Sequence, residues 1–281
     1  MNHIGVPIKP IRWADGAMPS TLCRAYTRMT CGQMKATPSI VATVPAMLLM
    51  VIGTTLIVSL LLLVYSSVRR SVSRMSRTTS SGQSWDERYA EDGFAFGTDP
   101  NDFLREVVEQ LPAGRTLCIG DGEGRNGVFL SQHGHDVVTI DLSPVGVVKA
   151  RRLAADRGVQ IDARVADLAE FDLGSDEWDC IVSVFCHLPP ALRHAVHSAV
   201  PAALRVGGCF VLEAYRSANI GRGVGGPQNA EMTVELEDVL GDIGAARGMS
   251  VVIGREVERH IVEGKYHNGM SATTQVLARK H

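Results

Sequence analysis

Residues 115–127 read RTLCIGDGEGRNG, and this stretch decides the fold. Its first part, Arg115 to Gly120, is a short apolar run typical of a buried strand. Glycines follow at once, and an apolar helical pattern extends from Asn126 to Gln132. Glycines at such a junction let the backbone turn tightly and approach a ligand, and the helix start offers unpaired N–H groups. The stretch predicts a strand, a glycine loop and a helix; a tight turn without a ligand is the alternative.

The chain after this stretch alternates strand and helix patterns, which is typical of an α/β protein with a mostly parallel sheet. Further strand patterns lie at 136–141, 160–165, 178–184, 208–214, 250–257 and 272–278. Helix patterns lie at about 143–157, 189–204 and 233–240. The last two strand patterns are joined by a short polar connection, so we expect them to form an antiparallel hairpin that closes the sheet.

Two acids follow strands of this pattern. Asp141 ends the second strand, where a carboxylate can accept hydrogen bonds from ribose hydroxyls, and Asp167 follows the third. The carboxyl ends of parallel strands meet at the edge where open α/β sheets bind ligands. The alternative to ligand binding for Asp141 is to cap the next helix, although Ser143 is already placed to do so. Asp167 fits a turn-forming role equally well.

Residues 122–127 also match the G-x-G-x-x-G fingerprint of dinucleotide-binding proteins, so an NAD-dependent oxidoreductase is a rival interpretation. Asp121 and Glu123 would face a pyrophosphate unfavourably, whereas S-adenosylmethionine carries a cationic sulfonium and an ammonium group. The chain also ends in the expected hairpin, without a separate substrate domain. Both observations favour the methyl donor.

Several motifs together resemble the bacterial tellurite-resistance and thiopurine-like methyltransferases. They are WDERY at 85–89, GFAFGT at 93–98, PN at 100–101, IGDGEGRNGVFL at 119–130, VSVFCHLP at 182–189 and GGP at 225–227. The resemblance covers about residues 84–279. Many relatives have Gly-Cys-Gly or Gly-Glu-Gly where this chain has Gly120-Asp121-Gly122, a change that keeps a small or acidic residue.

The resemblance implies a class I S-adenosylmethionine-dependent methyltransferase with a Rossmann-like α/β fold. Its sheet would be seven-stranded and mostly parallel, with the last strand antiparallel. The implied cofactor-binding residues are Gly120, Asp121, Gly122, Glu123, Gly124, Asn126, Asp141, Leu142, Asp167, Leu168 and Val184. We expect a small-molecule methyl acceptor; a non-catalytic module that binds S-adenosylmethionine is the alternative.

Methyl transfer from a sulfonium depends mainly on alignment of the nucleophile. A thiol, hydroxyl or carboxyl acceptor can also need a proton acceptor, and His187, just after the fourth strand, is the candidate catalytic residue. Its alternative role is to cap or orient the helix that follows. Glu213 and Tyr215 end the fifth strand and are candidates for the acceptor pocket, with a turn role as the alternative.

Two segments are candidates to cover the site. The glycine-rich loop 216–230 predicts a flap over the acceptor, or a plain surface connection. The N-terminal aromatic residues predict a lid, or packing against the sheet; they are Trp85, Tyr89, Phe94 and Phe96. His260, Glu263 and His267 lie in or beside the hairpin turn without a further ligand in range, so we assign no metal.

The segment before the domain differs sharply from it. Residues 1–39 hold five Lys or Arg and one acid, without apolar periodicity, and indicate a disordered or targeting segment. Residues 40–68 contain AMLLMVIGTTLIVSLLLLVY at 46–65, which predicts a single transmembrane helix. Residues 69–83 then form a linker and residues 84–281 the methyltransferase domain. A buried core helix is the alternative to the span, and a translation start at Met75 would omit it.

Basic residues lie on both sides of the predicted span, so they distinguish its two possible orientations only weakly. They favour the orientation in which the catalytic domain is cytosolic. The Arg-bearing, acid-poor N-terminus also resembles a transit peptide, so an organellar membrane is the alternative location. Net charge is −2, and the domain has no basic stripe, so nucleic acid is not an expected partner. The six cysteines lack metal-like spacing, and those in apolar strands indicate reduced thiols.

Overall fold

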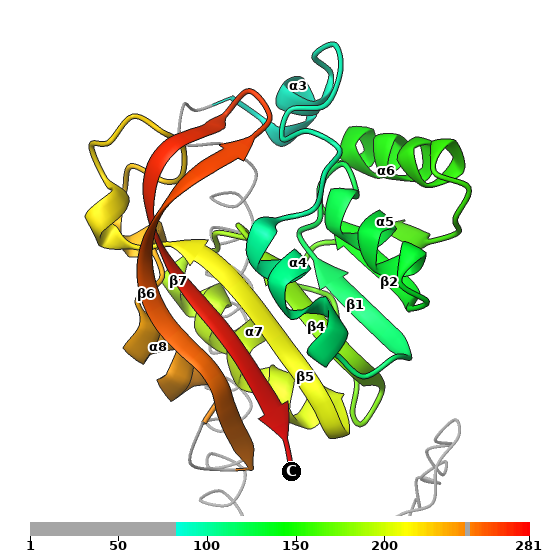
Figure 1. Ribbon diagram of the computed structural model, residues 1–281, viewed down its shortest axis with the longest axis vertical. Coiled ribbons are helices and arrows are strands. Elements are labelled where there is room, and N and C mark those ends of the chain that lie inside the picture. The colour runs from blue at the N-terminus through cyan, green and yellow to red at the C-terminus, as the bar shows by residue number, and fades with distance from the viewer. Residues whose placement is uncertain (1–82, 245–247) are drawn as a thin grey trace, which may run out of the picture. The chain divides into compact units, whose positions relative to one another are not determined.

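The computed structural model describes residues 83–244 and 248–281 (Figure 1). The predicted N-terminal segment 1–39, transmembrane helix 40–68 and linker 69–83, apart from its last residue, lie outside the described residues. Within the described ranges no helix is both long enough and apolar enough to span a bilayer.

Seven strands in the described part of the chain form one sheet, in the order β3-β2-β1-β4-β5-β7-β6. Their bounds are β1 Arg115–Ile119, β2 Asp136–Asp141, β3 Asp162–Val165, β4 Trp178–Val184, β5 Leu204–Tyr215, β6 Met249–Glu263 and β7 His267–Lys280. The first five strands run parallel, and β7 is antiparallel to both of its neighbours, β5 and β6. The predicted mostly parallel seven-stranded sheet with an antiparallel last strand is confirmed.

Helices cover both faces of this sheet. Their bounds are α3 Trp85–Tyr89, α4 Asp102–Val107, α5 Arg125–Gln132, α6 Pro144–Asp156, α7 Pro190–Ala203 and α8 Leu236–Asp242, with short 3-10 helices η1 Val108–Gln110, η2 Ser217–Asn219 and η3 Ala230–Met232. Helices α4 and α5 lie on the near face in Figure 1, and α7 and α8 lie behind the sheet. Ser143 caps α6 and Pro144 occupies its first turn, as the sequence predicts.

The strand β1 is buried on both faces because its side chains alternate between two hydrophobic cores. Leu117 and Ile119 pack with residues of α7 and α8, whereas Cys118 packs with Phe103 of α4 and Phe129 of α5. A strand covered on both sides reads as a continuous apolar run, which is why its sequence pattern is clear.

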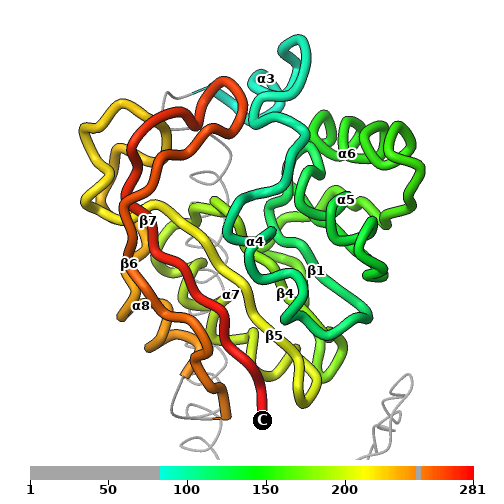
Figure 2. Tube along the Cα trace, viewed as in Figure 1, coloured from blue at the N-terminus to red at the C-terminus, as the bar shows by residue number. Residues whose placement is uncertain are grey.

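The C-terminal hairpin is longer than its sequence pattern. β6 continues to Glu263 and pairs with β7 down to Glu263 and His267. From Ser250 to His260 the residues of β6 are half-buried or exposed, and several are charged. The apolar sequence pattern therefore ends before the strand does. In Figure 2 the tip of this hairpin lies beside the N-terminal segment that contains α3. A backbone hydrogen bond of 2.9 Å from Lys265 N to Ala95 O joins them.

Candidate functional site

The glycine loop between β1 and α5 has a backbone that favours glycine. Gly120, Gly122 and Gly124 have φ values of 61°, 57° and 86°. A Cβ atom at Gly120 would lie 2.5 Å from the Cys186 sulfur, and one at Gly124 would lie 2.6 Å from the Ala150 Cβ. These glycines are therefore required by backbone conformation and packing, whether or not a ligand binds.

Two partly buried carboxylates hold the backbone of this loop. Asp121 Oδ2 accepts hydrogen bonds from Gly127 N at 3.1 Å and Thr139 Oγ1 at 3.0 Å. Asp141 accepts from Gly122 N and Ser143 N, each at 2.8 Å and each through its own oxygen. Burial raises the pKa of Asp121 and of Asp141 to about 6 in each case, against the opposing effect of these hydrogen bonds.

The third acid of the loop, Glu123, is buried and paired. Its Oε2 accepts a 2.7 Å hydrogen bond from Ala95 N, and its Oε1 lies 3.0 Å from Lys149 Nζ. Asp121 likewise directs its carboxylate to loop and strand donors. The charge argument against a dinucleotide is therefore weaker than the sequence indicates, because Glu123 is neutralised by Lys149.

A cavity of about 1080 Å³ opens beside this loop at the carboxyl edge of the strands. Ligand pockets commonly span roughly 300–1,000 Å³, so this cavity has the size of a large small-molecule site. The predicted site residues that line it are Gly120, Asp121, Gly122, Glu123, Asn126, Asp141, Leu142, Asp167, Leu168, Val184 and His187. Gly124 is not among its lining residues, because the position packs against Ala150 of α6.

Two of these lining residues have clear structural duties. Asn126 Oδ1 accepts a 3.0 Å hydrogen bond from Asn101 N and so fixes the segment that leads into α4. Asp167 Oδ1 accepts a 2.9 Å hydrogen bond from Ala169 N, which is a turn-forming contact. Their predicted roles as cofactor ligands stay predictions.

The N-terminal segment 83–99 lies against the glycine loop and the start of α6. Asp86 accepts a hydrogen bond from Ser143 Oγ, and Lys149 Nζ donates to the Glu91 carbonyl at 2.8 Å and the Gly93 carbonyl at 2.6 Å. Three of the four predicted lid aromatics line the cavity: Trp85, Tyr89 and Phe96. Phe94 packs instead with a small core cluster between α5 and α6.

His187 lines the cavity, but backbone groups engage both of its ring nitrogens. Nδ1 donates to the Met232 carbonyl at 3.0 Å, and Nε2 accepts a long 3.4 Å hydrogen bond from Tyr215 N. Burial lowers the pKa of His187 to about 4, so the ring is neutral at pH 7. This geometry favours the orienting interpretation, and the catalytic role of His187 stays a prediction.

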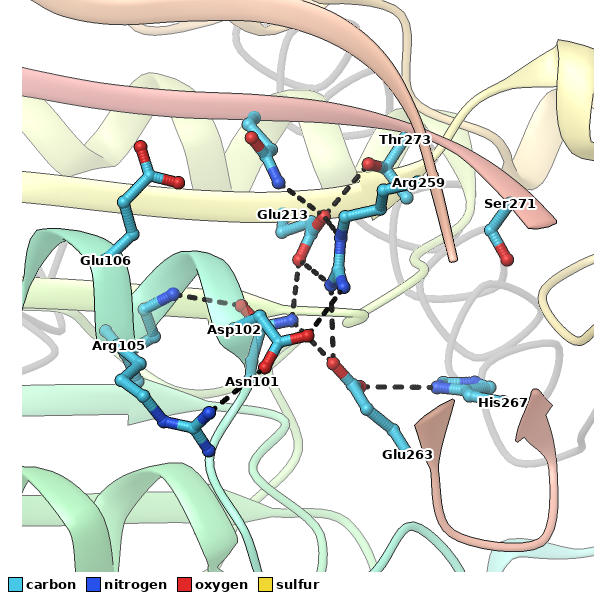
Figure 3. Close-up of polar contacts among 12 residues, drawn as sticks. Asn101, Asp102, Arg105, Glu106, Glu213, Arg259, Glu263, His267, Ser271 and Thr273 are labelled. Atoms are coloured by element: carbon cyan, nitrogen blue, oxygen red, sulfur yellow. Dashed lines mark hydrogen bonds and ion pairs between the residues drawn. The ribbon is translucent and has the colours of Figure 1, made fainter. Parts of the chain in front are cut away.

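The structure separates the two predicted acceptor residues of β5 from the cavity lining. Glu213 is fully buried and binds Arg259 at 2.7 Å and Asn101 at 2.6 Å (Figure 3). Tyr215 packs behind the cavity wall, with its ring centroid 4.6 Å from Phe185 and 5.2 Å from His267. The expectation that Glu213 lines the acceptor pocket is wrong, because this carboxylate is enclosed by its own donors.

Sequence reasoning missed three aromatic residues of the cavity wall. Phe185 has a positive φ of 52°, and it lines the cavity with Tyr266 and His267. Phe185 follows β4 in the resembling motif VSVFCHLP, which could have indicated it. His267 begins β7 after the hairpin turn, where the sequence suggested only the rejected metal site. Among the described residues no cluster of three or more potential metal ligands is found.

A methyltransferase-domain family model matches residues 116–208, a range that includes the glycine loop, Asp141 and Asp167. A 2-heptyl-1-hydroxyquinolin-4(1H)-one methyltransferase of Mycobacteroides abscessus is 22% identical over 156 residues, which cover 54% of this chain and 69% of that protein. A ribosomal protein L11 methyltransferase of Symbiobacterium thermophilum is 37% identical over 99 residues, covering 32% of this chain and 31% of that protein.

Solved structures share the fold. The crystal structure of TehB from Haemophilus influenzae superposes with a TM-score of 0.52 at 18% identity, covering 64% of this chain and 62% of TehB. The fold and the domain match together support a class I S-adenosylmethionine-dependent methyltransferase. They support S-adenosyl-L-methionine as the cofactor and favour the methyl donor over a dinucleotide. The tellurite-resistance and thiopurine-like subfamily stays a prediction.

Proposed function

We propose that this protein transfers a methyl group from S-adenosyl-L-methionine to a small, partly apolar acceptor. The observation that carries the proposal is a single cavity that joins the glycine loop and Asp141 to an aromatic wall from other elements. Its volume accommodates a donor and an acceptor side by side.

The donor side of the cavity fits S-adenosylmethionine. Asp141 and Asp167 present carboxylates beside the glycine loop, which suit hydroxyl and cationic groups, and Leu142, Leu168 and Val184 add apolar surface suited to a purine. When bound, the cofactor supplies an electrophilic methyl group on a cationic sulfonium. The protein then contributes chiefly by aligning the acceptor and excluding water.

The acceptor side is built from apolar residues and the glycine-rich loop. Leu188, Leu192 and Met232 line it together with Phe185 and Pro227. The quinolone methyltransferase relative is named for a planar heterocycle with an N-hydroxyl group, which is the chemistry this wall suits. Without a basic stripe on the domain, a nucleic acid is a poor candidate acceptor.

The test of the donor is isothermal titration of the full-length protein with S-adenosylmethionine and, separately, with NADH. We expect binding of the methyl donor only. Replacement of Asp141 by alanine should weaken it by about 10- to 100-fold, the effect of losing hydrogen bonds to a charged group. Asp136→Ala changes the exposed acid at the other end of β2 and should leave the affinity unchanged.

Either of two results would contradict this proposal. A folded protein that ignores S-adenosylmethionine would exclude the methyltransferase, and binding of NADH would support the dinucleotide alternative. Binding of S-adenosylmethionine without methyl transfer to a panel of hydroxyl, thiol and tellurite acceptors would favour the non-catalytic module. Turnover of tellurite or a small thiol within that panel would support the tellurite-resistance and thiopurine-like subfamily.

We also propose that residues 40–68 hold the protein in a membrane by a single helix, with the domain in the cytosol. The apolar stretch 46–65 supports this proposal, and an organellar membrane is the alternative. Carbonate extraction of cells that express either the full chain or a version without 40–68 tests it. Extraction-resistant protein that depends on 40–68 is the expected result, and extraction of the full chain would contradict it.

A further inference from the structure

His267 stands at the end of a buried chain of polar contacts and forms part of the cavity wall. It is 8% exposed and lies between aromatic rings, with centroid distances of 4.5 Å to Phe96 and 4.8 Å to Phe185. Its Nδ1 lies 3.8 Å from Glu263 Oε2 and has no hydrogen-bond partner in the structure. Figure 3 shows the ring directed toward that carboxylate. Within the described part of the chain, no hydrogen bond engages Nε2 of His267.

Glu263, the last residue of β6, is held by donors from its own strand and from two other parts of the chain. Arg125 of α5 lies 2.5 Å from its Oε2, Asn101 donates to its Oε1 at 3.0 Å, and Arg259 of β6 lies 3.3 Å from Oε1. Although burial alone would raise it, His267 and Arg125 hold the pKa of Glu263 at about 2. The carboxylate is therefore ionised throughout the physiological range and can stabilise a positive charge on His267.

The two cavity histidines differ in what their rings can still do. Both nitrogens of His187 contact backbone groups, whereas His267 has an anionic partner for one nitrogen and a free second nitrogen. Burial also lowers the pKa of His267, with Glu263 opposing it, so the ring is neutral at pH 7. A neutral imidazole with Nδ1 facing a carboxylate at 3.8 Å resembles the arrangement of a general base, in which this contact shortens to a hydrogen bond when the substrates bind.

We propose that His267 accepts the proton of the methyl acceptor and that Glu263 is the positioning residue that orients its ring and stabilises the imidazolium. This inference rests on the proposed methyltransferase function. It further specifies the acceptor as a planar ring with an ionisable O–H, N–H or S–H group, which would lie against Phe96 and Phe185.

The proposed methyl transfer balances in atoms, charge and electrons. The acceptor atom forms a bond to the methyl carbon, and the carbon–sulfur bond breaks with its electron pair remaining on the sulfur, which becomes neutral. The acceptor's proton moves to Nε2 of His267. The imidazolium then releases this proton to solvent as the products leave.

Several charged or titratable groups face His267 and set its behaviour with pH. Glu263 of β6 raises its pKa, whereas Arg125 of α5 and Arg88 of α3 lower it. His187, which follows β4, and Tyr215 of β5 also face the ring, and both are uncharged at pH 7. The carboxylate of Glu263 is thus the group that favours the protonated ring.

Nuclear magnetic resonance of ring-labelled histidine in the full-length protein tests the pair without any ligand. We expect His267 to be neutral at pH 7 with its proton on Nδ1 and to titrate below its usual pKa. Glu263→Gln should lower this pKa further and release the tautomer, and Glu263→Asp, which keeps the charge, should restore both. A His267 ring with its proton on Nε2, or one that ignores Glu263→Gln, would overturn the proposal.

The kinetic test uses 2-heptyl-1-hydroxyquinolin-4(1H)-one as the probe acceptor. For the wild type, kcat/KM should rise with pH through the pKa of His267 and then level off. His267→Gln should remove this rise and lower the plateau by about 10²-fold or more, the usual contribution of general base catalysis. His194→Gln, an exposed histidine of α7, is the matched control and should keep the wild-type profile.

The outcomes separate this inference from the proposed function. A wild-type protein that does not bind S-adenosylmethionine would contradict the proposed methyltransferase function. Normal donor binding and methyl transfer with an unchanged profile in His267→Gln contradicts only the role of His267. Loss of the pH-dependent rise in His187→Gln instead would return the role to His187.

Discussion

Gly124 and Gly134 have nearly the same backbone conformation, with φ values of 86° and 85°, in very different surroundings. A Cβ atom at Gly134 would meet nothing within 4 Å, whereas one at Gly124 would lie 2.6 Å from the Cβ and 2.8 Å from the Cα of Ala150. Both alanine variants carry the cost of a left-handed residue, about 1–2 kcal/mol. Gly124→Ala should cost about 1–3 kcal/mol more, because α6 must move.

Urea unfolding followed by fluorescence measures this difference directly. Equal midpoints for the two variants would contradict the packing role assigned to Gly124. The comparison also explains why a motif glycine can be indispensable without contacting a ligand. The glycine motif contains residues that line the cavity, Gly120 and Gly122, and one that does not, Gly124. The sequence does not distinguish them, whereas the structure shows that Gly124 packs against α6.

At the scale of elements, the segment 83–99 is attached to the glycine loop through few polar contacts. Glu123 is central because it accepts from Ala95 N and pairs with Lys149, which itself donates to carbonyls of the segment. Glu123→Gln should therefore speed hydrogen exchange at the Ala95 amide and increase cleavage of the segment by protease. Glu109→Gln, an exposed acid in η1, is the control. Unchanged exchange at Ala95 in the Glu123 variant would contradict this attachment.

The strands β2 and β4 begin and end at the residues that the sequence predicts, because an apolar run covered on both faces has sharp limits. The hairpin could not be predicted in full. The outer half of β6 alternates charged with half-buried residues, and its strand conformation depends on pairing with β7, which the local sequence does not report. Pairing at the hairpin turn places His267 opposite Glu263, and the fold then brings this turn to the cavity, which the local sequence pattern does not report.

At the scale of the whole molecule, one buried carboxylate ties the hairpin to the rest of the domain. Glu263 has its pKa lowered from 4.5 to about 2 and is almost fully buried. Since the folded-state pKa is lower, this group contributes stability above pH 4.5 and loses it as pH falls toward 2. The contribution is roughly 3 kcal/mol, because each pKa unit corresponds to about 1.4 kcal/mol.

Denaturant unfolding at a series of pH values tests this expectation. The stability difference between the wild type and Glu263→Gln should be largest above pH 5 and should shrink between pH 4.5 and 2. A difference that stays constant over this range would show that Glu263 acts through packing alone.

The place of β7 between β5 and β6 bears on how the protein is made. During synthesis β6 leaves the ribosome before β7, yet its ladder partner in the sheet is β7, which also joins it to β5. The donor half of the site, built from residues 120–168, can therefore fold on the nascent chain while residues 249–263 wait unpaired. A ribosome that stalls before about residue 267 would release a chain that lacks His267 and β7 and leaves the edge of β5 unpaired, which is a natural substrate for chaperones and proteases.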